Sequence, residues 1–225
     1  MISSIVTVGR MDDGDRDAVA RILQAFDATV APEVAGLRRR QVYTYCDLYI
    51  QVEDWDSAIA AGARPDRDPR LARLDAELAR YLHEYVPDGW TGPDGSPGSR
   101  GPAAERFYVW PDDELAGFEK LHCAVIVNSM RTSAIPEVSR LFAELDATDF
   151  PASMGTLRRQ VLLFRGIYLH IQDFANMESK EVIGDAWKEA DPRFLKIVAD
   201  LTPIVPPYNA EGGQLATRFY HWAAA

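Results

Sequence analysis

Cysteine, basic residues and long apolar runs are all scarce in this chain of 225 residues. The two cysteines, Cys46 and Cys123, form no CxxC pair and no zinc-type cluster, which argues against a disulfide framework or a zinc site and favours a reduced, cytoplasmic protein. The longest aliphatic stretches are strand-sized, as in Cys123–Val127, so a membrane span is not expected. The first residues, MISSIV, lack the basic start and long apolar core of a signal peptide.

The shortage of positive charge argues against a whole class of partners. The chain has 24 basic residues against 34 acidic ones, which gives a net charge of -10. Such a protein repels the phosphates of nucleic acid and of an anionic membrane surface. The triplet Arg38–Arg40 is too short to reverse this, so neither nucleic acid nor membrane is an expected partner.

Several catalytic signatures are missing as well. No Gly-x-Ser-x-Gly elbow occurs, and the glycines of residues 92–101 do not lie between a strand and a helix, as a phosphate-binding loop requires. His83, His122 and His221 show no metal-ligand spacing, so no metal site is expected. What is present is an ordinary globular composition, with 47% hydrophobic and 10% aromatic residues.

The chain repeats itself. "RRRQVYTYCDLYIQV" begins at Arg38, and the similar "LRRQVLLFRGIYLHI" begins at Leu157. One offset carries the match through each half, with small drifts where loops are inserted, and this ordered similarity indicates two copies of one module. The matched pairs include Val6 with Val125, Val8 with Val127, Met11 with Met130, Val19 with Val138, Gly36 with Gly155, Arg40 with Arg159, and Tyr49 with Tyr168.

Each copy begins with the same pair of predicted elements. An alternating strand comes first, at about Ile2–Arg10 and Leu121–Asn128. A helix follows, because apolar residues recur at i, i+3, i+4 and i+7. This stripe consists of Val19, Ile22, Leu23 and Phe26 in the first copy and of Val138, Leu141, Phe142 and Leu145 in the second.

The second half of each copy also follows one plan. Two strands are joined by a tight turn, Cys46-Asp47 or Arg165-Gly166, whose Asp and Gly suit a positive φ. A second helix starts at an Asp-Pro pair, a capping residue followed by proline at the first helical position. Its stripe is Leu71, Leu74, Leu78 and Leu82, or Phe194, Ile197, Val198 and Leu201. A final aromatic strand, "FYVW" or "FYHW", is expected to close each module.

The order strand-helix-strand-strand-helix-strand predicts an α+β fold made of two ferredoxin-like βαββαβ modules. The modules are expected at residues 1–113 and 118–225, with the Gly/Pro-rich stretch Asp88–Ala104 as an insertion in the first. Helices cover one face of such a sheet and leave the other bare. The two sheets are therefore expected to cover each other, as an intramolecular pseudo-dimer of the dimeric α/β-barrel type.

One face of the second hairpin gathers polar groups. With the turn at Arg165-Gly166, Val161 lies opposite His170, and period two places Arg159 on the same face. The opposite face is apolar and is expected to pack on the helices, so Arg159 and His170 are predicted to point between the two sheets. In the first copy the same construction brings together Arg40, Val42, Tyr49 and Gln51.

An aspartate ends the first helix of each copy. Asp27 and Asp146 directly follow the last apolar residue of their stripes. The helix dipole disfavours an acid at this end, so its recurrence in both copies indicates a specific role.

These motifs, in this order, resemble the tetracenomycin-type cyclases of aromatic (type II) polyketide pathways. The resemblance covers nearly the whole chain apart from the Gly/Pro-rich insertion. In the first copy it rests on "RMDDGD", "FDAT", "GLRRRQV", "CDLYIQV", "DPRL" and "FYVW". In the second copy it rests on "LDAT", "TLRRQV", "IYLHI", "DPRF" and "FYHW".

The resemblance implies a dimeric α/β-barrel fold and an intramolecular aldol-type ring closure with dehydration of a poly-β-ketone, without metal or organic cofactor. It implies that the family's interior arginine is Arg40 or Arg159 and that its helix-end aspartate is Asp27 or Asp146. The family's hairpin histidine is His170 in the second copy. It is replaced by glutamine in the first copy, and a further histidine before the aspartate is replaced in both, at Phe26 and Leu145.

This comparison favours the second copy as the catalytic one. His170 would transfer protons, Arg159 would hold the developing oxyanion, and Asp146 would orient a partner or act as the base. The remaining polar and aromatic positions would contact the substrate, and they are Arg40, Asp27, Gln51, Tyr49, Tyr168 and Trp222.

Other interpretations stay open. Arg159 and Asp146 could form a purely structural ion pair, as the equivalent pair in the first copy suggests. The same fold hosts cofactor-independent monooxygenases of polyphenolic intermediates. The chain could also bind the polyketide without reacting, as a partner of other pathway enzymes, and the fused chain could pair again as a homodimer.

Overall fold

The computed structural model describes residues 2–31, 34, 36–56, 68–87, 103–111, 122–174, 191–209, 211 and 213–224. Residues 88–102 of the Gly/Pro-rich insertion and the predicted boundary between residues 113 and 118 lie outside this described part. None of the helices in these ranges is both long enough and apolar enough to cross a membrane. The chain forms two compact units, one of Met1–Ala104 with Thr217–Ala225 and the other of Glu105–Ala216.

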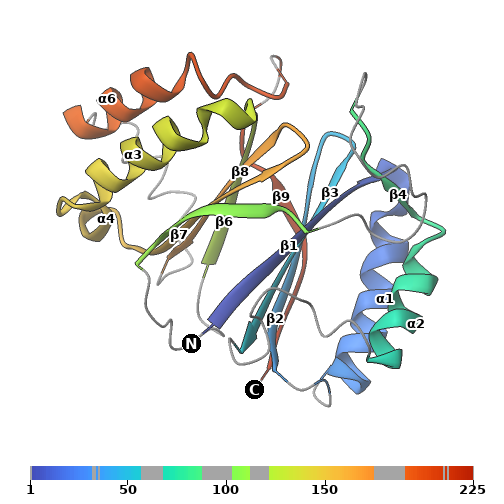
Figure 1. Ribbon diagram of the computed structural model, residues 1–225. Helices are drawn as coiled ribbons and strands as arrows, with labels where there is room; N and C mark the ends of the chain where they lie inside the picture. The colour runs from blue at the N-terminus through green and yellow to red at the C-terminus, as the bar shows by residue number, and fades with distance from the viewer. Residues whose placement is uncertain are drawn as a thin grey trace. The chain divides into compact units, whose positions relative to one another are not determined.

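The first unit is a five-stranded antiparallel sheet in the order β4-β1-β3-β2-β9. Two helices, α1 and α2, lie side by side against it (Figure 1). Its elements are β1 (Ile2–Met11), α1 (Arg16–Thr29), β2 (Leu37–Tyr45), β3 (Leu48–Asp56), α2 (Pro69–Leu78), β4 (Leu82–Glu84) and β9 (Thr217–Ala223).

The second unit is a four-stranded antiparallel sheet in the order β5-β7-β8-β6. Helices α3, α4 and α6 pack on it, and α3 contacts both of the other helices and the strand β5. Its elements are β5 (Glu105–Trp110), β6 (His122–Ser129), α3 (Ile135–Asp146), α4 (Phe150–Ser153), β7 (Thr156–Phe164), β8 (Ile167–Phe174) and α6 (Pro192–Leu201).

The predicted α+β fold is confirmed: two antiparallel sheets carry helices, in the strand and helix order expected from each repeat. The second helices start as predicted, because Asp68 and Asp191 accept backbone hydrogen bonds of 2.9 and 2.8 Å from Arg70 and Arg193. One assignment was wrong. Helix α2 ends at Leu78, and Leu82 begins the short strand β4 instead of continuing the helical stripe.

The closing strands are exchanged between the repeats. Strand β9, from the second repeat, pairs with β2 and places Trp222 opposite Arg40. Strand β5, from the first repeat, pairs with β7 and places Trp110 opposite Arg159. The expectation that each closing strand completes its own module was therefore wrong. Because "FYVW" and "FYHW" are nearly the same strand, local sequence cannot decide which copy each one joins.

The hairpin register agrees with the prediction. Val161 lies opposite His170, and Leu163 lies opposite Tyr168. The turn holds Arg165 at a φ of 46° and Gly166 at 85°, which is the left-handed conformation that a two-residue hairpin turn requires.

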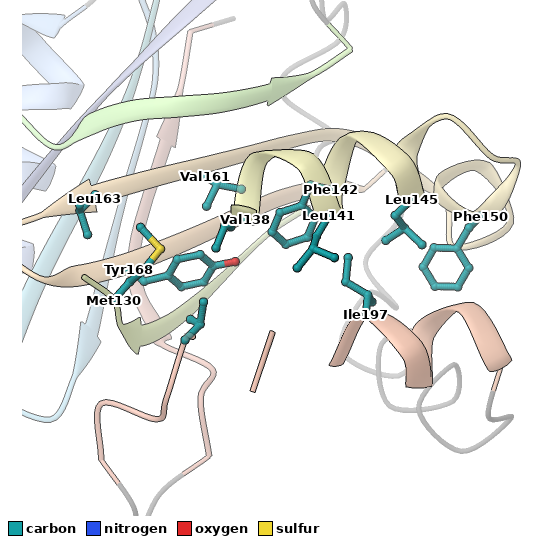
Figure 2. Packing of buried hydrophobic residues seen from close by; sticks show 11 residues of the cluster. Met130, Val138, Leu141, Phe142, Leu145, Phe150, Val161, Leu163, Tyr168 and Ile197 are labelled. Carbon is teal, nitrogen blue, oxygen red and sulfur yellow. The ribbon is translucent and has the colours of Figure 1, made fainter. Parts of the chain in front are cut away.

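The face of this hairpin was predicted wrongly. Val161, Leu163 and Tyr168 belong to one buried cluster with Val138 and Leu141 of α3 (Figure 2), so the face that carries Arg159 and His170 is the helix-packing one. Both faces of the hairpin are apolar enough to be buried, and hydrophobicity alone could not distinguish them. The polar groups therefore lie between the sheet and its own helices.

Candidate functional site

Three charged or titratable groups meet beneath α3 in the second unit. Arg159, near the middle of β7, donates from Nε to Asp146 Oδ1 at 3.1 Å and forms an ion pair of 2.9 Å with Oδ2, and Asp146 is the last residue of α3. Its Nη1 lies 3.0 Å from Nε2 of His170 on the adjacent strand β8. All three side chains are buried. The predicted residues Arg159, His170 and Asp146 are thus brought together.

The surroundings of His170 keep it neutral. Burial in the first place, and the positive charge of Arg159 in the second, hold the pKa of His170 well below its usual value of 6.5. Since the guanidinium can only donate, Nε2 of His170 accepts this hydrogen bond and the ring proton resides on Nδ1. The geometry therefore presents His170 as a base held by an arginine.

Burial acts on Asp146 in the opposite sense. Loss of hydration raises the pKa of Asp146 above its usual 3.8, although the charge of Arg159 and two hydrogen bonds oppose the shift. One of these bonds comes from the hydroxyl of Tyr108 on β5, at 2.9 Å. Strand β5, which comes from the first repeat, thus contributes a side chain to the site in the second unit.

Aromatic rings enclose the arginine and the histidine. The guanidinium carbon of Arg159 lies 4.9 Å from the ring centroid of Phe142, within the range of a cation–π contact. The same ring lies 4.9 Å from the imidazole of His170, centroid to centroid. Figure 2 shows Phe142 on α3 and Tyr168 on the hairpin in the same apolar cluster. The site is a triplet of polar side chains within an apolar shell.

The guanidinium of Arg159 has a further neutral partner. In the amide orientation that satisfies both groups, the side-chain oxygen of Gln172 lies 2.9 Å from Nη1 and 3.3 Å from Nη2 of Arg159. Nε, Nη1 and Nη2 therefore all have acceptors within the protein. With His170 neutral, one carboxylate balances one guanidinium.

The first unit builds a different site at the equivalent place. Arg40 on β2 forms an ion pair with Asp27 near the end of α1, and its Nε donates to Glu53 Oε1 of β3 at 3.0 Å. Gln51 Nε2 donates to the same oxygen of Glu53 at 2.6 Å, and the hydroxyl of Tyr49 donates to Gln51 Oε1. All five side chains are buried.

Two partners from other elements complete this arrangement. The hydroxyl of Tyr220 on β9 donates to Asp27 Oδ2 at 2.9 Å. The ring of Phe26, where the resemblance places a lost histidine, lies 5.3 Å from the guanidinium carbon of Arg40.

Burial alone would lower the pKa of Arg40, but the carboxylates of Glu53 and Asp27 raise it above its usual value. Burial, with the charge of Glu53 as a smaller cause, raises the pKa of Asp27 above 3.8.

Trp222 lies in a different unit from His170. It belongs to β9 in the first unit, opposite Arg40, and packs beside the cluster of Trp55 and Leu71. In the described part of the chain no group of three or more His, Cys, Asp or Glu side chains is arranged to hold a metal ion.

Four contributors were missed in the sequence. Glu53 and Gln172 lie two residues beyond Gln51 and His170, so the period of the strand could have placed them on the same face. Tyr108 and Tyr220 are the tyrosines of the two closing motifs. Only the exchanged pairing brings them to Asp146 and Asp27, and no local signal carries that information.

Comparison with known proteins gives a family match over both repeats. The family model described as polyketide synthesis cyclase matches residues 3–111 and again residues 122–223. Tetracenomycin F2 cyclase of Streptomyces glaucescens is 29% identical over 102 residues, which are 45% of this chain and 87% of that protein. An uncharacterized protein of Streptomyces coelicolor is 29% identical over 108 residues, which are 45% of this chain and 95% of that protein. One relative thus corresponds to about one repeat.

Solved structures extend the similarity to the whole chain at the level of the fold. A candidate monooxygenase from Fusobacterium nucleatum covers 100% of this chain and 94% of its own, with a TM-score of 0.58 and 10% identity. An anthrone oxidase-like protein covers 100% of this chain and 93% of its own, with a TM-score of 0.55 and 13% identity. At these identities the likeness concerns the arrangement of elements alone.

Proposed function

The chain belongs to the polyketide synthesis cyclase family, and on this basis we propose that it closes a ring within a poly-β-ketone chain by an aldol-type reaction followed by loss of water. The observation that carries the proposal is the contact of Arg159 with His170 and Asp146 in the second unit. It pairs an oxygen-binding cation with a neutral base, which is what enolate formation needs.

In the proposed first step, a keto oxygen of the substrate replaces His170 as the acceptor of the Arg159 Nη1 hydrogen bond. The lone pair of His170 Nε2 is thereby released. Nε2 takes a proton from the methylene next to that carbonyl, and the electron pair of the broken C–H bond moves onto the oxygen held by Arg159. The fixed positive charge stabilises the enolate in a buried site, where electrostatic effects are strong.

Ring closure then needs no oxidant or reductant. The enolate carbon attacks a second carbonyl of the same chain, and a C–C bond forms while the proton on His170 passes to the resulting alkoxide and makes it a hydroxyl. His170 then takes the second proton of the same methylene and passes it to this hydroxyl, which leaves as water while the electron pair of the broken C–H bond completes the double bond. Asp146 holds Arg159 in place throughout, and its own oxygens are held by Arg159 and Tyr108.

The proposed substrate is a polyphenolic or partly cyclised aromatic polyketide, and the aromatic residues around the two sites suit such a molecule. Tyr168 would contact a substrate bound in the second unit, and Arg40, Asp27, Gln51 and Tyr49 would contact one bound in the first unit. Handover from other enzymes of the same pathway is part of the proposal, because an uncyclised poly-β-ketone reacts spontaneously if it is left free.

Mass spectrometry of the products tests this function. The purified protein is incubated with an uncyclised or partly cyclised aromatic polyketide, in air and without oxygen. Loss of one water per ring, at the same rate in both conditions, is the expected result. A gain of oxygen that needs air would instead show an oxygenase, and an unchanged substrate despite binding would show a non-catalytic partner.

A further inference from the structure

Gln172 lies against the two terminal nitrogens of the Arg159 guanidinium. The two residues are directly opposite each other on the paired strands β8 and β7. The amide oxygen of Gln172 lies 2.9 Å from Nη1 and 3.3 Å from Nη2, so it accepts from both nitrogens at once. This planar fork of N–H groups is the part of an arginine that binds pairs of ligand oxygens. Gln172 therefore occupies a position on Arg159 that suits a substrate oxygen.

The partners of Arg159 differ in how easily a ligand can replace them. Asp146 is charged and buried, and removing one member of a buried ion pair is costly, so this partner stays. His170 and Gln172 are neutral acceptors, and exchange of one neutral acceptor for another keeps the number of hydrogen bonds the same. Gln172 is also partly exposed, whereas Arg159 and His170 are buried. A ligand can thus replace the two neutral acceptors and leave the ion pair intact.

The first unit has an acid at the equivalent position. Glu53 lies opposite Arg40 in the register that places Gln172 opposite Arg159. Glu53 is buried, and its carboxylate accepts from Nε of Arg40 at 3.0 Å. A hydrogen bond between two charged groups is stronger than one to a neutral amide. The second unit therefore places a neutral, partly exposed acceptor on its arginine, where the first unit places a buried acid.

We propose that Gln172 makes the second unit selective for β-diketones, because its oxygen reserves a second position on Arg159 for a second keto oxygen of the substrate. This inference rests on the proposed function and adds a specificity-determining residue to it. One keto oxygen replaces His170 at Nη1, and the oxygen of the neighbouring carbonyl replaces Gln172 at Nη2. When Nε2 of His170 takes a proton from the methylene between them, the electron pair of the C–H bond spreads over both oxygens, and Arg159 holds each of them.

A substrate with a single ketone has no second oxygen for this position. It replaces His170 at Nη1 and leaves Gln172 on Nη2, so only one oxygen of its enolate would be held. The residue at position 172 should therefore change the binding of a β-diketone much more than the binding of a simple ketone. A purely structural role of Gln172 would affect both ligands alike.

Binding of two matched probes tests this assignment by titration calorimetry. Naphthoylacetone is a β-diketone too short to close a ring, and acetylnaphthalene is its counterpart with one ketone. The wild type should bind naphthoylacetone more tightly. Gln172→Glu should weaken this binding at least about tenfold, because the new carboxylate forms a charge-assisted pair with Arg159 that the ligand must break. Gln172→Ala removes the competing acceptor and should tighten it.

Acetylnaphthalene serves as the control for correct folding, since its binding should persist in both variants. No preference of the wild type for naphthoylacetone would overturn the proposal. Equal shifts for the two probes, or weaker binding of naphthoylacetone in both variants, would overturn it as well. Because neither probe can be cyclised, these results stand whether or not the proposed ring closure occurs, and product analysis with a polyketide tests that function separately.

Discussion

The hydroxyl of Tyr220 donates a hydrogen bond of 2.9 Å to Asp27, although the two residues lie in the last strand and the first helix of the chain. The second unit repeats this bond between Tyr108 and Asp146. In both units a tyrosine from an exchanged strand donates a hydrogen bond to an aspartate. That aspartate in turn forms an ion pair with the central arginine. The exchange of strands therefore does more than extend the sheets, because it completes both polar sites.

Removal of this hydroxyl should weaken the first site. Tyr220→Phe deletes one hydrogen bond to the ionised form of Asp27, so the pKa of Asp27 should rise further. The free energy of unfolding should fall by about 1 kcal/mol. Urea unfolding measures the loss, and Tyr108→Phe should give a similar value in the other unit. A change below a few tenths of a kcal/mol in both variants would show that the hydroxyls contribute nothing.

Truncation tests the exchanged pairing itself. A chain that ends at Ala216 lacks β9, so the β2 groups that bond to it lose their partners. Amide hydrogen exchange should show reduced protection along Arg39–Thr44, while the hairpin of the second unit keeps its own partners. Unchanged protection of β2, together with reduced protection of β7, would mean that β9 pairs within its own repeat.

The neutral state of His170 predicts a dependence of stability on pH. The pKa of His170 is lower in the folded protein than in the unfolded chain, where it is about 6.5. Between these two values the unfolded chain binds more protons, so the free energy of unfolding falls as the pH drops below about 6.5. The stabilisation is fully present above that pH.

The aspartates act in the opposite direction. Because the pKa values of Asp27 and Asp146 are raised in the folded protein, these residues add to the free energy of unfolding below pH 3.8. This contribution is lost as the pH rises through their pKa values in the folded protein. His170→Gln removes only the contribution of the histidine to the free energy of unfolding. Comparing urea unfolding of this variant and of the wild type between pH 7 and pH 5 therefore measures that contribution. The wild type should lose stability over this range more steeply than the variant, and parallel curves would contradict a neutral buried histidine.

A buried ion pair on the opposite face of the second sheet should be expensive to break. Arg158 donates to Asp173 at 2.7 Å, and both side chains are buried. Asp173→Ala should lower the free energy of unfolding by about 3–5 kcal/mol, because it leaves a buried cation without this partner. The exposed pair Arg140–Glu144 is the control, and Glu144→Ala should cost at most about 0.5 kcal/mol. Equal losses in the two variants would show that burial of the pair is unimportant.

Much of the fold could be predicted from local patterns. The stripes of α1 and α3, the Asp-Pro helix starts and the turn at Arg165-Gly166 each depend on residues close together in the chain. The position of this turn also predicts the register that brings Val161 opposite His170, and period two places Arg159 on the same face. These features follow from backbone geometry and capping, which short stretches of sequence encode.

The site was only partly predictable for a physical reason. Arg159 and His170 were correctly placed on one face, but both faces of the hairpin are buried, so no difference in polarity revealed which one meets the helices. The partners Tyr108 and Tyr220 depend on a pairing between strands far apart in the chain. Two nearly identical repeats offer each sheet two equivalent closing strands, and the choice between them is made by the whole fold.

The most direct measurement of the central claim is the rate of oxygen-independent water loss with and without Arg159→Lys. Lysine keeps the positive charge but cannot contact Asp146 and a substrate oxygen through one planar group. The account predicts a rate at least about 100-fold lower with lysine, while substrate binding is retained. An unchanged rate would contradict the assignment of Arg159 as the group that holds the enolate oxygen.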